Sequence, residues 1–305
     1  MLEDRHSSYE AALKTAERIA FRLDDVLPEG ATLDFSRPFL PESLARSGEL
    51  GFLSASEQRT LNQIRAHAYL RLFGLVEEFI LPFVLDHARS ALGQGDQRTR
   101  ALLQFAGEEA KHIALFKRFS DAFERGFGSR CEAVGPAAAV ADKVLSHAPL
   151  GVALAILHIE WMTQRHYVES VKRDQQLEPL FKSLLKQHFS EECQHAKLDT
   201  LIALELAESL DDAAVLASVD DYFAIADALD QLLVAQVGLD LASFERACQR
   251  TLTFEQRTAF CASQLRACRF TYLGAGMSHP SFVATVAELC PGALPRLEMR
   301  AARYV

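Results

Sequence analysis

Two glutamate–histidine pairs share the spacing E-x-x-H, namely Glu109 with His112 and Glu192 with His195. Residues three apart on a helix lie on one face, so each pair could hold one metal ion through a carboxylate and an imidazole. A further match near the N-terminus shows that the spacing also arises by chance. The helix face that each pair occupies must therefore decide whether the pair has a chemical role.

Both pairs lie on the apolar faces of their segments. Glu109 shares its face with Phe105 and Phe116, and Glu192 shares its face with Phe181. A buried carboxylate or imidazole needs a partner or a metal ion to offset the loss of hydration. A buried salt bridge would explain one such pair, but the same motif on two helices favours a metal site.

Two further segments each offer a single glutamate. Glu160 lies on an apolar face of its segment. In the segment near residue 78, Glu77 lies on the apolar stripe while Glu78 shares its stripe with charged residues. The stripe favours Glu77 as the ligand and leaves Glu78 as the alternative. The resulting order, Glu, E-x-x-H, Glu, E-x-x-H, is the ligand pattern of di-iron carboxylate helix bundles.

Three more residues are candidates around this set. His188 lies four residues before Glu192 on the same face, and its spacing fits a metal ligand and a hydrogen-bonded core histidine equally well. Tyr167 could lie behind the ligands, although core packing is the simpler interpretation. Asp199 could hold a histidine ligand through its second nitrogen, or it could lie at the surface. Glu108 and Glu191, beside the ligand glutamates, are expected to be solvated.

The elements that must position these residues are helices, because helical periodicity dominates and no alternating strand pattern is present. Ser54 and Glu57 form a capping-box signal that opens the second predicted helix. Helices are predicted at residues 7–27, 54–92, 97–125, 137–175 with a possible break near 149–151, 178–209, 212–236, 241–273 and 281–290. The prediction is an all-α chain with one domain. Its metal-binding bundle spans about 54–209, after an N-terminal helix and connector (1–53) and before C-terminal helices (210–305).

The ordered set Glu77 or Glu78, Glu109, His112, Glu160, His188, Glu192 and His195 resembles that of the ferritin-like di-iron N-oxygenases of the p-aminobenzoate N-oxygenase family. The resemblance implies a ferritin-like four-helix bundle core and an extra histidine ligand, here His188. It also implies two iron ions, O2 as co-substrate and oxygenation of an amine nitrogen. Because two external electrons are needed, a reductase or ferredoxin partner is implied. Manganese or a mixed Mn/Fe pair would fit the same ligands.

Composition narrows the class of protein. The chain has 305 residues, 49% of them hydrophobic, and a formal net charge of −9. The acidic balance argues against nucleic acid as a partner. We expect no membrane span and no signal peptide, and the six cysteines show no C-x-x-C pair. These features predict a cytoplasmic protein, with a homodimer as one possible assembly.

Other functions fit the same ligands. A di-iron hydroxylase or desaturase acting on another small molecule would use a related site. A non-catalytic ferroxidase or iron-binding protein is a further alternative, but a plain four-helix unit needs fewer than 305 residues. We therefore expect an O2-dependent oxygenase whose additional helices enclose a substrate pocket.

Overall fold

The computed structural model describes residues 2–93 and 96–304, and every regular element in these ranges is helical. The long helices are α1 (Leu2–Ile19), α4 (Ala55–Ala91), α5 (Asp96–Phe127), α7 (Pro149–Arg165), α8 (Pro179–Glu208), α9 (Asp212–Cys248) and α10 (Phe254–Arg269). The shorter ones are α2 (Leu23–Val26), α3 (Glu42–Ala45), α6 (Ala137–Leu145), α11 (Ala275–Met277), α12 (Pro280–Leu289) and α13 (Leu294–Ala301), with 3-10 turns η1 (Ser47–Glu49) and η4 (Pro291–Ala293). Two π-helical segments, η2 (His166–Val171) and η3 (Phe270–Gly274), continue α7 and α10. The predicted all-α fold is confirmed.

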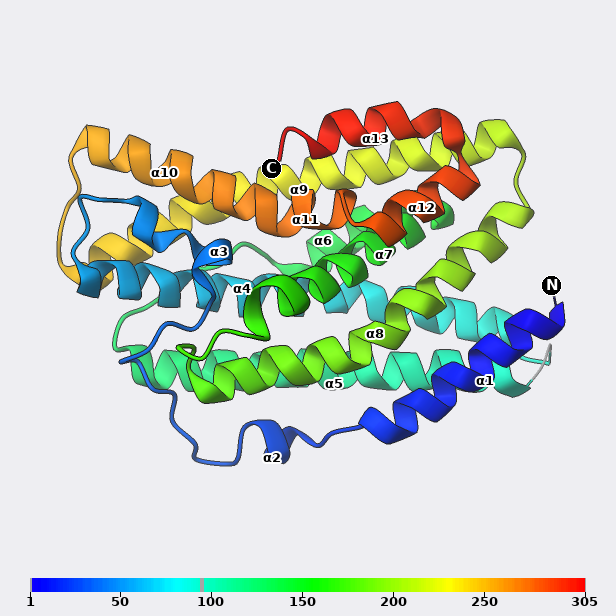
Figure 1. Ribbon diagram of the computed structural model, residues 1–305, viewed down its shortest axis with the longest axis horizontal. Helices are drawn as coiled ribbons and strands as arrows, with labels where there is room; N and C mark the ends of the chain where they lie inside the picture. The colour runs from blue at the N-terminus through cyan, green and yellow to red at the C-terminus, as the bar shows by residue number, and fades with distance from the viewer. Residues whose placement is uncertain (1, 94–95, 305) are drawn as a thin grey trace.

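The core is a ferritin-like bundle of α4, α5, α7 and α8. α4 packs along α5, and α7 packs along α8. In Figure 1 the helices from α9 to α13 form a layer on one side of this bundle, while α1 crosses α5 and α8 on the other. Apolar faces fix this arrangement, since all four bundle helices contribute buried side chains to one large hydrophobic cluster. The bundle therefore surrounds a core in which any polar group must find a partner.

The capping box at the start of α4 is present. The Ser54 hydroxyl accepts a hydrogen bond from the Glu57 amide, and the Glu57 carboxylate accepts one from the Ser54 amide at 2.8 Å. α4 then continues through Pro82 to Ala91. This helix positions Glu77 about six turns from its capped end.

Several predicted helix ends are wrong. The first helix ends at Ile19, and α2 starts anew after Arg22, whose amide donates a hydrogen bond to the Asp25 carboxylate at 3.3 Å. The break predicted near 149–151 is confirmed, and it falls just before Pro149 because a residue that precedes proline is disfavoured in helical conformation. α9 runs through Gly238, where we predicted a break, and ends at Cys248, followed by Gln249 with a left-handed φ of 50°. Helical backbone continues through the predicted loop at 274–280 as far as Met277, and α13 was not predicted.

α9 is the one helix among the described residues that is long and apolar enough to pass a test for a membrane span. It packs against α4, α7 and α10 in the structure. Of its most apolar stretch of 18 residues, 44% is buried against the rest of the protein. Packing therefore accounts for part of the apolar composition of α9.

Buried histidines connect α7 and η2 to η3. The Nε2 of His158 lies 3.0 Å from the carbonyl oxygen of Tyr272, and its Nδ1 lies 2.8 Å from the hydroxyl of Tyr222. His166 contacts the carbonyl oxygen of Thr271 in the same way at 2.9 Å. Since a carbonyl only accepts, both Nε2 atoms carry a proton. Burial lowers the pKa of His158 and of His166 to about 4, so both rings are neutral at pH 7.

We predict that His158 makes the fold sensitive to acid. Burial lowers the pKa of His158 to about 4, against 6.5 for the ordinary side chain. Below pH 6.5 the unfolded chain binds a proton that the folded chain does not bind until about pH 4. The stabilisation is therefore complete above pH 6.5 and is lost as the pH falls towards 4, by up to about 1.4 kcal/mol per pH unit. Urea unfolding of the parent protein and of His158→Gln across this range measures it, and equal slopes for the two proteins would contradict the prediction.

α11 approaches α7 so closely that only glycine fits at position 276. A Cβ atom at Gly276 would lie 2.6 Å from the backbone oxygen of His158. Gly276→Ala should therefore lower the free energy of unfolding by about 2 kcal/mol or more. Gly238→Ala is the matched control, because no atom lies within 4 Å of its Cβ position. We expect it to be neutral or to stabilise α9 by up to about 1 kcal/mol. Equal urea midpoints for the two variants would refute the close-approach argument.

Candidate metal centre

Four helices bring the predicted ligand residues to one place inside the bundle. α4 supplies Glu77, α5 supplies Glu109 and His112, α7 supplies Glu160, and α8 supplies His188, Glu192 and His195. None of these side chains is more than 2% exposed. A helical face on each element points inwards, because the same faces carry the apolar side chains that close the bundle.

Two overlapping groups of donor atoms form within this set. The first comprises Glu77, His112, His188 and Glu192, and the second comprises Glu109, His112, Glu192 and His195. Within each group one donor atom per residue lies within 4.8 Å of all the others. His112 and Glu192 belong to both groups. The two groups therefore suit a pair of neighbouring ions with shared ligands.

Glu192 is the centre of the contacts between these groups. Its Oε1 lies 2.5 Å from the Nε2 of His188 and 3.1 Å from the Nδ1 of His112. Its Oε2 lies 2.7 Å from the Nδ1 of His195. One carboxylate thus contacts all three imidazoles of the cluster.

The adjacent glutamates Glu77 and Glu78 lie in different surroundings. Glu77 is 2% exposed, and its Oε1 lies 3.2 Å from the Nε2 of His188. Glu78 is exposed and lines a groove beside Gly74 and Phe116. The structure therefore brings Glu77, and not Glu78, to the other predicted ligands.

Glu160 and Asp199 lie beside the two groups and outside them. The Glu160 carboxyl interacts with Glu192, and one of its oxygens has no hydrogen-bond partner. Asp199 is fully buried, and neither of its oxygens has a partner. Its charge interacts with that of His195, which fits the position predicted for it behind a histidine ligand.

Tyr167 is not brought to the cluster. Its ring is half-buried and stacks on Phe189 at a centroid distance of 4.3 Å. Tyr167 belongs to the π-helical segment η2, which rotates the residues that follow His166 relative to a regular helix. The face that an ideal helix predicts for Tyr167 therefore differs from its place in the structure.

The charges of the cluster are strongly coupled. Burial alone would lower the pKa of His112 and His195, but the carboxylates of Glu192 and Glu109 outweigh it and hold both pKa values well above the usual range. Burial also acts to raise the pKa of Glu192, but the three imidazoles hold it well below its usual range. Burial and the neighbouring carboxylates raise the pKa of Glu77. Protons thus balance a concentration of negative charge that metal cations could balance instead.

Unsatisfied donor atoms support the same interpretation. The buried atoms without a hydrogen-bond partner include Glu77 Oε2, both carboxylate oxygens of Glu109, His112 Nδ1 and Glu160 Oε2. Unpartnered buried polar atoms are uncommon in proteins and need a physical explanation. The atoms named here lie together in one cluster of carboxylates and imidazoles, which are the ligand types that iron and manganese bind. The residues present therefore fit a pair of such ions.

The prediction that Glu108 and Glu191 are solvated is wrong. Both are buried, and each contacts a histidine of the opposite motif: Glu108 Oε2 lies 2.9 Å from His195 Nε2, and Glu191 Oε2 lies 2.8 Å from His112 Nε2. Each is thus placed to orient a histidine whose Nδ1 faces the cluster. The sequence held a signal for these two partners, because both motifs read Glu-Glu-x-x-His. In the structure, the first glutamate of each motif points towards the helix that carries the other motif.

Solved structures and a protein-family model both match this chain. The chain is similar to solved structures of R2-like ligand-binding oxidases. One, with an aerobically reconstituted Mn/Fe cofactor, shows 13% identity and a TM-score of 0.47 over 87% of this chain and 91% of that chain. Another, a point mutant with an aerobically reconstituted Fe/Fe cofactor, also shows 13% identity and a TM-score of 0.47, over 87% and 92%. No curated protein matches the chain.

The family comparison is more specific. Residues 43–214, more than half of the chain, match the family model of the p-aminobenzoate N-oxygenase AurF. The matched range contains α4, α5, α7 and α8 with every residue of the cluster. Together with the buried cluster, this match supports an oxygen-using metalloenzyme. The chain belongs to the p-aminobenzoate N-oxygenase AurF family.

Proposed function

We propose that this protein is an O2-dependent di-iron oxygenase that transfers oxygen to the nitrogen of a small amine. The observation that carries the proposal is the pair of overlapping donor groups, linked by His112 and Glu192, inside a chain of the N-oxygenase family. Glu77, Glu109, His112, His188, Glu192 and His195 of the two groups would hold the ions, and Glu160, whose carboxyl interacts with Glu192 beside them, would complete the set. Two iron ions, or a Mn/Fe pair, would supply O2 activation and two of the electrons that it requires.

The chain's own residues would control water and charge around the ions. Phe73 and Phe116 contact the ring of His188 at centroid distances of 5.4 and 4.9 Å, and Phe105 stacks on His195 at 4.0 Å. These rings exclude water from the donor groups, which strengthens electrostatic interactions there. Glu108 and Glu191 would hold the outer nitrogens of His195 and His112, and so fix which nitrogen of each ring faces the ions.

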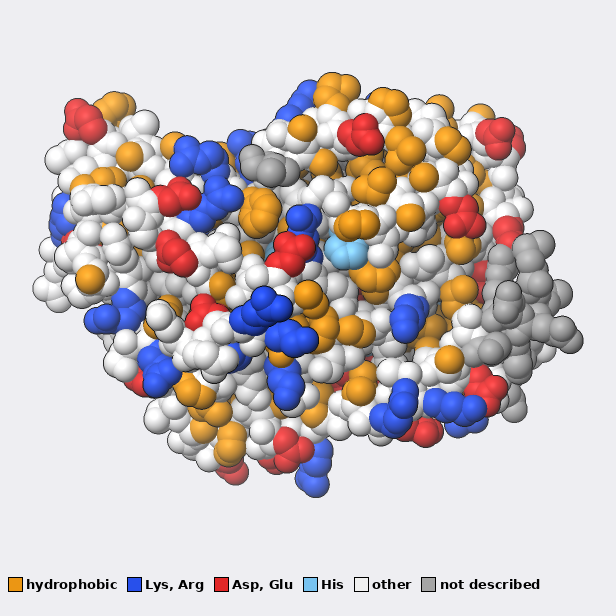
Figure 2. All heavy atoms as spheres, in the orientation of Figure 1, with side chains coloured by type: hydrophobic (Ala, Val, Ile, Leu, Met, Phe, Trp, Pro, Cys, Tyr) orange, Lys and Arg blue, Asp and Glu red, His pale blue; other side chains and the backbone are white. Residues whose placement is uncertain are grey.

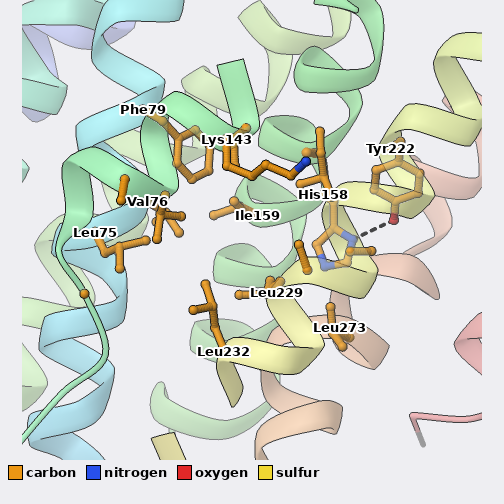
Figure 3. Close-up of a pocket in the computed structure, with 18 of the residues that line it drawn as sticks. Leu75, Val76, Phe79, Lys143, His158, Ile159, Tyr222, Leu229, Leu232 and Leu273 are labelled. Atoms are coloured by element: carbon orange, nitrogen blue, oxygen red, sulfur yellow. Dashed lines mark hydrogen bonds between the residues drawn. The ribbon is translucent and has the colours of Figure 1, made fainter. Parts of the chain in front are cut away.

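An apolar pocket between α4, α6, α7 and α9 is the proposed substrate site (Figure 3). Its volume is about 320 Å³, within the range of small-molecule sites. Leu75 and Val76 of α4 line one side, and Ala155 and Ile159 of α7 line another. These are the two helices that each carry a single glutamate of the cluster. Val76 and Ile159 directly precede Glu77 and Glu160 in the chain, so the pocket lies on the neighbouring face of each of these helices, and a substrate bound there would reach the cluster between α4 and α7.

The lining of this pocket favours an apolar or planar amine. Leu229 and Leu232 of α9 form its outer wall, and the only charged side chain among the lining residues is Lys143. A sugar would lose most of its hydration there, because Lys143, His158 and Tyr222 are the polar side chains among the lining residues and His158 and Tyr222 already bond to each other. N-oxygenation of such an amine consumes one O2, two electrons and two protons, and yields a hydroxylamine and water. The electrons would come from a reductase or ferredoxin.

The test combines product analysis with a variant that blocks the pocket. Iron-loaded protein is supplied with reductant, ¹⁸O2 and a panel of arylamines, alkylamines and hydrocarbons, and the products are identified by mass spectrometry. Hydroxylamine or nitro products that carry ¹⁸O support the proposal. Ala155→Phe should abolish these products and keep the metal content, while Ala217→Phe, at an exposed position of α9, should leave both unchanged.

Other outcomes would redirect the assignment. Oxygen inserted only into C–H bonds would indicate a hydroxylase. Oxidation of Fe(II) with no organic product from any compound would indicate a ferroxidase. If Ala155→Phe keeps full turnover, the substrate reaches the cluster by another route, for which the groove beside Gly74 and Phe116 is the alternative.

A further inference from the structure

A group of basic side chains covers the end of α7 and the middle of α8. Lys172 and Arg173 follow η2 and are exposed, and Lys186 is exposed on α8. The space-filling view shows Lys and Arg side chains gathered over these elements near the centre of the visible face (Figure 2). Among the described residues no carboxylate forms an ion pair with any of these three. They therefore present unpaired positive charge on a chain whose net charge is −9.

The centre of this region is apolar. Val168 is 54% exposed, and the neighbouring ring of Tyr167 stacks on Phe189 at a centroid distance of 4.3 Å. Tyr167 and Phe189 are both half-buried. We call Tyr167, Val168, Phe189, Lys172, Arg173 and Lys186 the η2 surface. An apolar centre with charged groups around it is typical of surfaces that bind another protein transiently.

The η2 surface lies next to the cluster along the chain. Phe189 directly follows His188, whose Nε2 contacts both Glu77 and Glu192. Phe189 and His188 are consecutive residues of α8, so the half-buried aromatic pair and the buried imidazole lie on adjoining faces of one helix. The docking surface is thus separated from the first donor group by the thickness of α8.

We propose that the η2 surface docks an acidic one-electron carrier protein of the ferredoxin class. The inference rests on the proposed oxygenase function, which consumes two electrons per turnover. Each encounter would deliver one electron through the Tyr167–Phe189 pair towards His188, and the carrier would leave oxidised. Two encounters would then complete one turnover.

Charge supports this choice of partner. The net charge of −9 repels an acidic protein from most of the surface, so an exposed group of unpaired cations gives it one favourable orientation. A basic carrier would be attracted elsewhere on the molecule. The η2 surface thus accounts for both the recognition and the orientation of the carrier.

The test uses a triple charge reversal and a matched control. Lys172→Glu, Arg173→Glu and Lys186→Glu are combined in one variant. The control combines Arg59→Glu, Arg100→Glu and Arg125→Glu, three exposed positions on α4 and α5 with the same change of net charge. The probe is an acidic plant-type [2Fe–2S] ferredoxin. Its Kd is measured at about 20 mM and about 300 mM salt, and the anaerobic rate at which it reduces the iron-loaded protein is followed optically.

We expect the η2 variant to raise the Kd and to slow reduction by ferredoxin by at least about tenfold at low salt, with a smaller difference at high salt. The control variant should change both by less than about threefold. Equal effects of the two variants, or none, would overturn the docking surface. Reduction by dithionite with methyl viologen distinguishes the two proposals. If these small molecules cannot reduce the iron-loaded parent protein, the proposed oxygenase function itself has failed. If they reduce it normally and the η2 variant leaves the ferredoxin kinetics unchanged, only the proposed docking surface is wrong.

Discussion

Replacing Glu192 with glutamine is expected to remove metal binding at both donor groups. Glu192 belongs to both groups and contacts His112, His188 and His195. An amide offers one weak oxygen donor in place of two charged ones, so the loss should exceed the roughly 10- to 100-fold change typical of residues that only support a ligand. We expect iron content after anaerobic loading to fall from about two ions per chain to well below one, and any oxygenase activity to disappear.

The control for this change is Glu169→Gln, since Glu169 is an exposed carboxylate of η2 that pairs with Arg165 at 3.0 Å. It should keep both ions. Helical circular dichroism of Glu192→Gln should match that of the parent protein, because the apolar faces of the bundle do not depend on Glu192. Retention of two tightly bound ions by Glu192→Gln would contradict the shared-ligand arrangement.

The adjacent substitutions Glu77→Gln and Glu78→Gln should have opposite outcomes. Glu77 is buried against His188, while Glu78 is exposed. We expect Glu77→Gln to lose at least one ion, with affinity reduced by more than about 100-fold, and Glu78→Gln to bind iron as the parent protein does. The measurement is iron content and the dissociation constant for Fe(II) under anaerobic conditions.

These two variants test each other, because they make the same chemical change at neighbouring positions of one helix. Equal loss in both would mean that α4 is rotated in the metal-bound protein. Equal retention would mean that the first group does not need a ligand from α4. Only the asymmetric result fits the arrangement of Glu77 described above.

The periodicity of the sequence predicted most of the bundle, because an apolar stripe with a period of about 3.6 residues already specifies a helix and its buried face. The same stripes placed Glu109, Glu160, Glu192 and their histidines towards the interior. Helix ends were predicted less well. α9 passes through Gly238 because contacts with α4, α7 and α10 stabilise the helix as a whole, and a local signal such as a glycine cannot report those contacts.

The sequence by itself determined the fold class, the family and the set of residues with chemical potential. It left Glu77 and Glu78 as alternatives, because neighbouring residues differ by only about 100° around a helix. Only the tertiary structure decided that Glu108 and Glu191 are buried partners of the opposite histidines, and that Tyr167 faces outwards. The reason is that burial of a polar side chain depends on what the next helix presents to it, and a π-helical segment changes the face on which later residues lie.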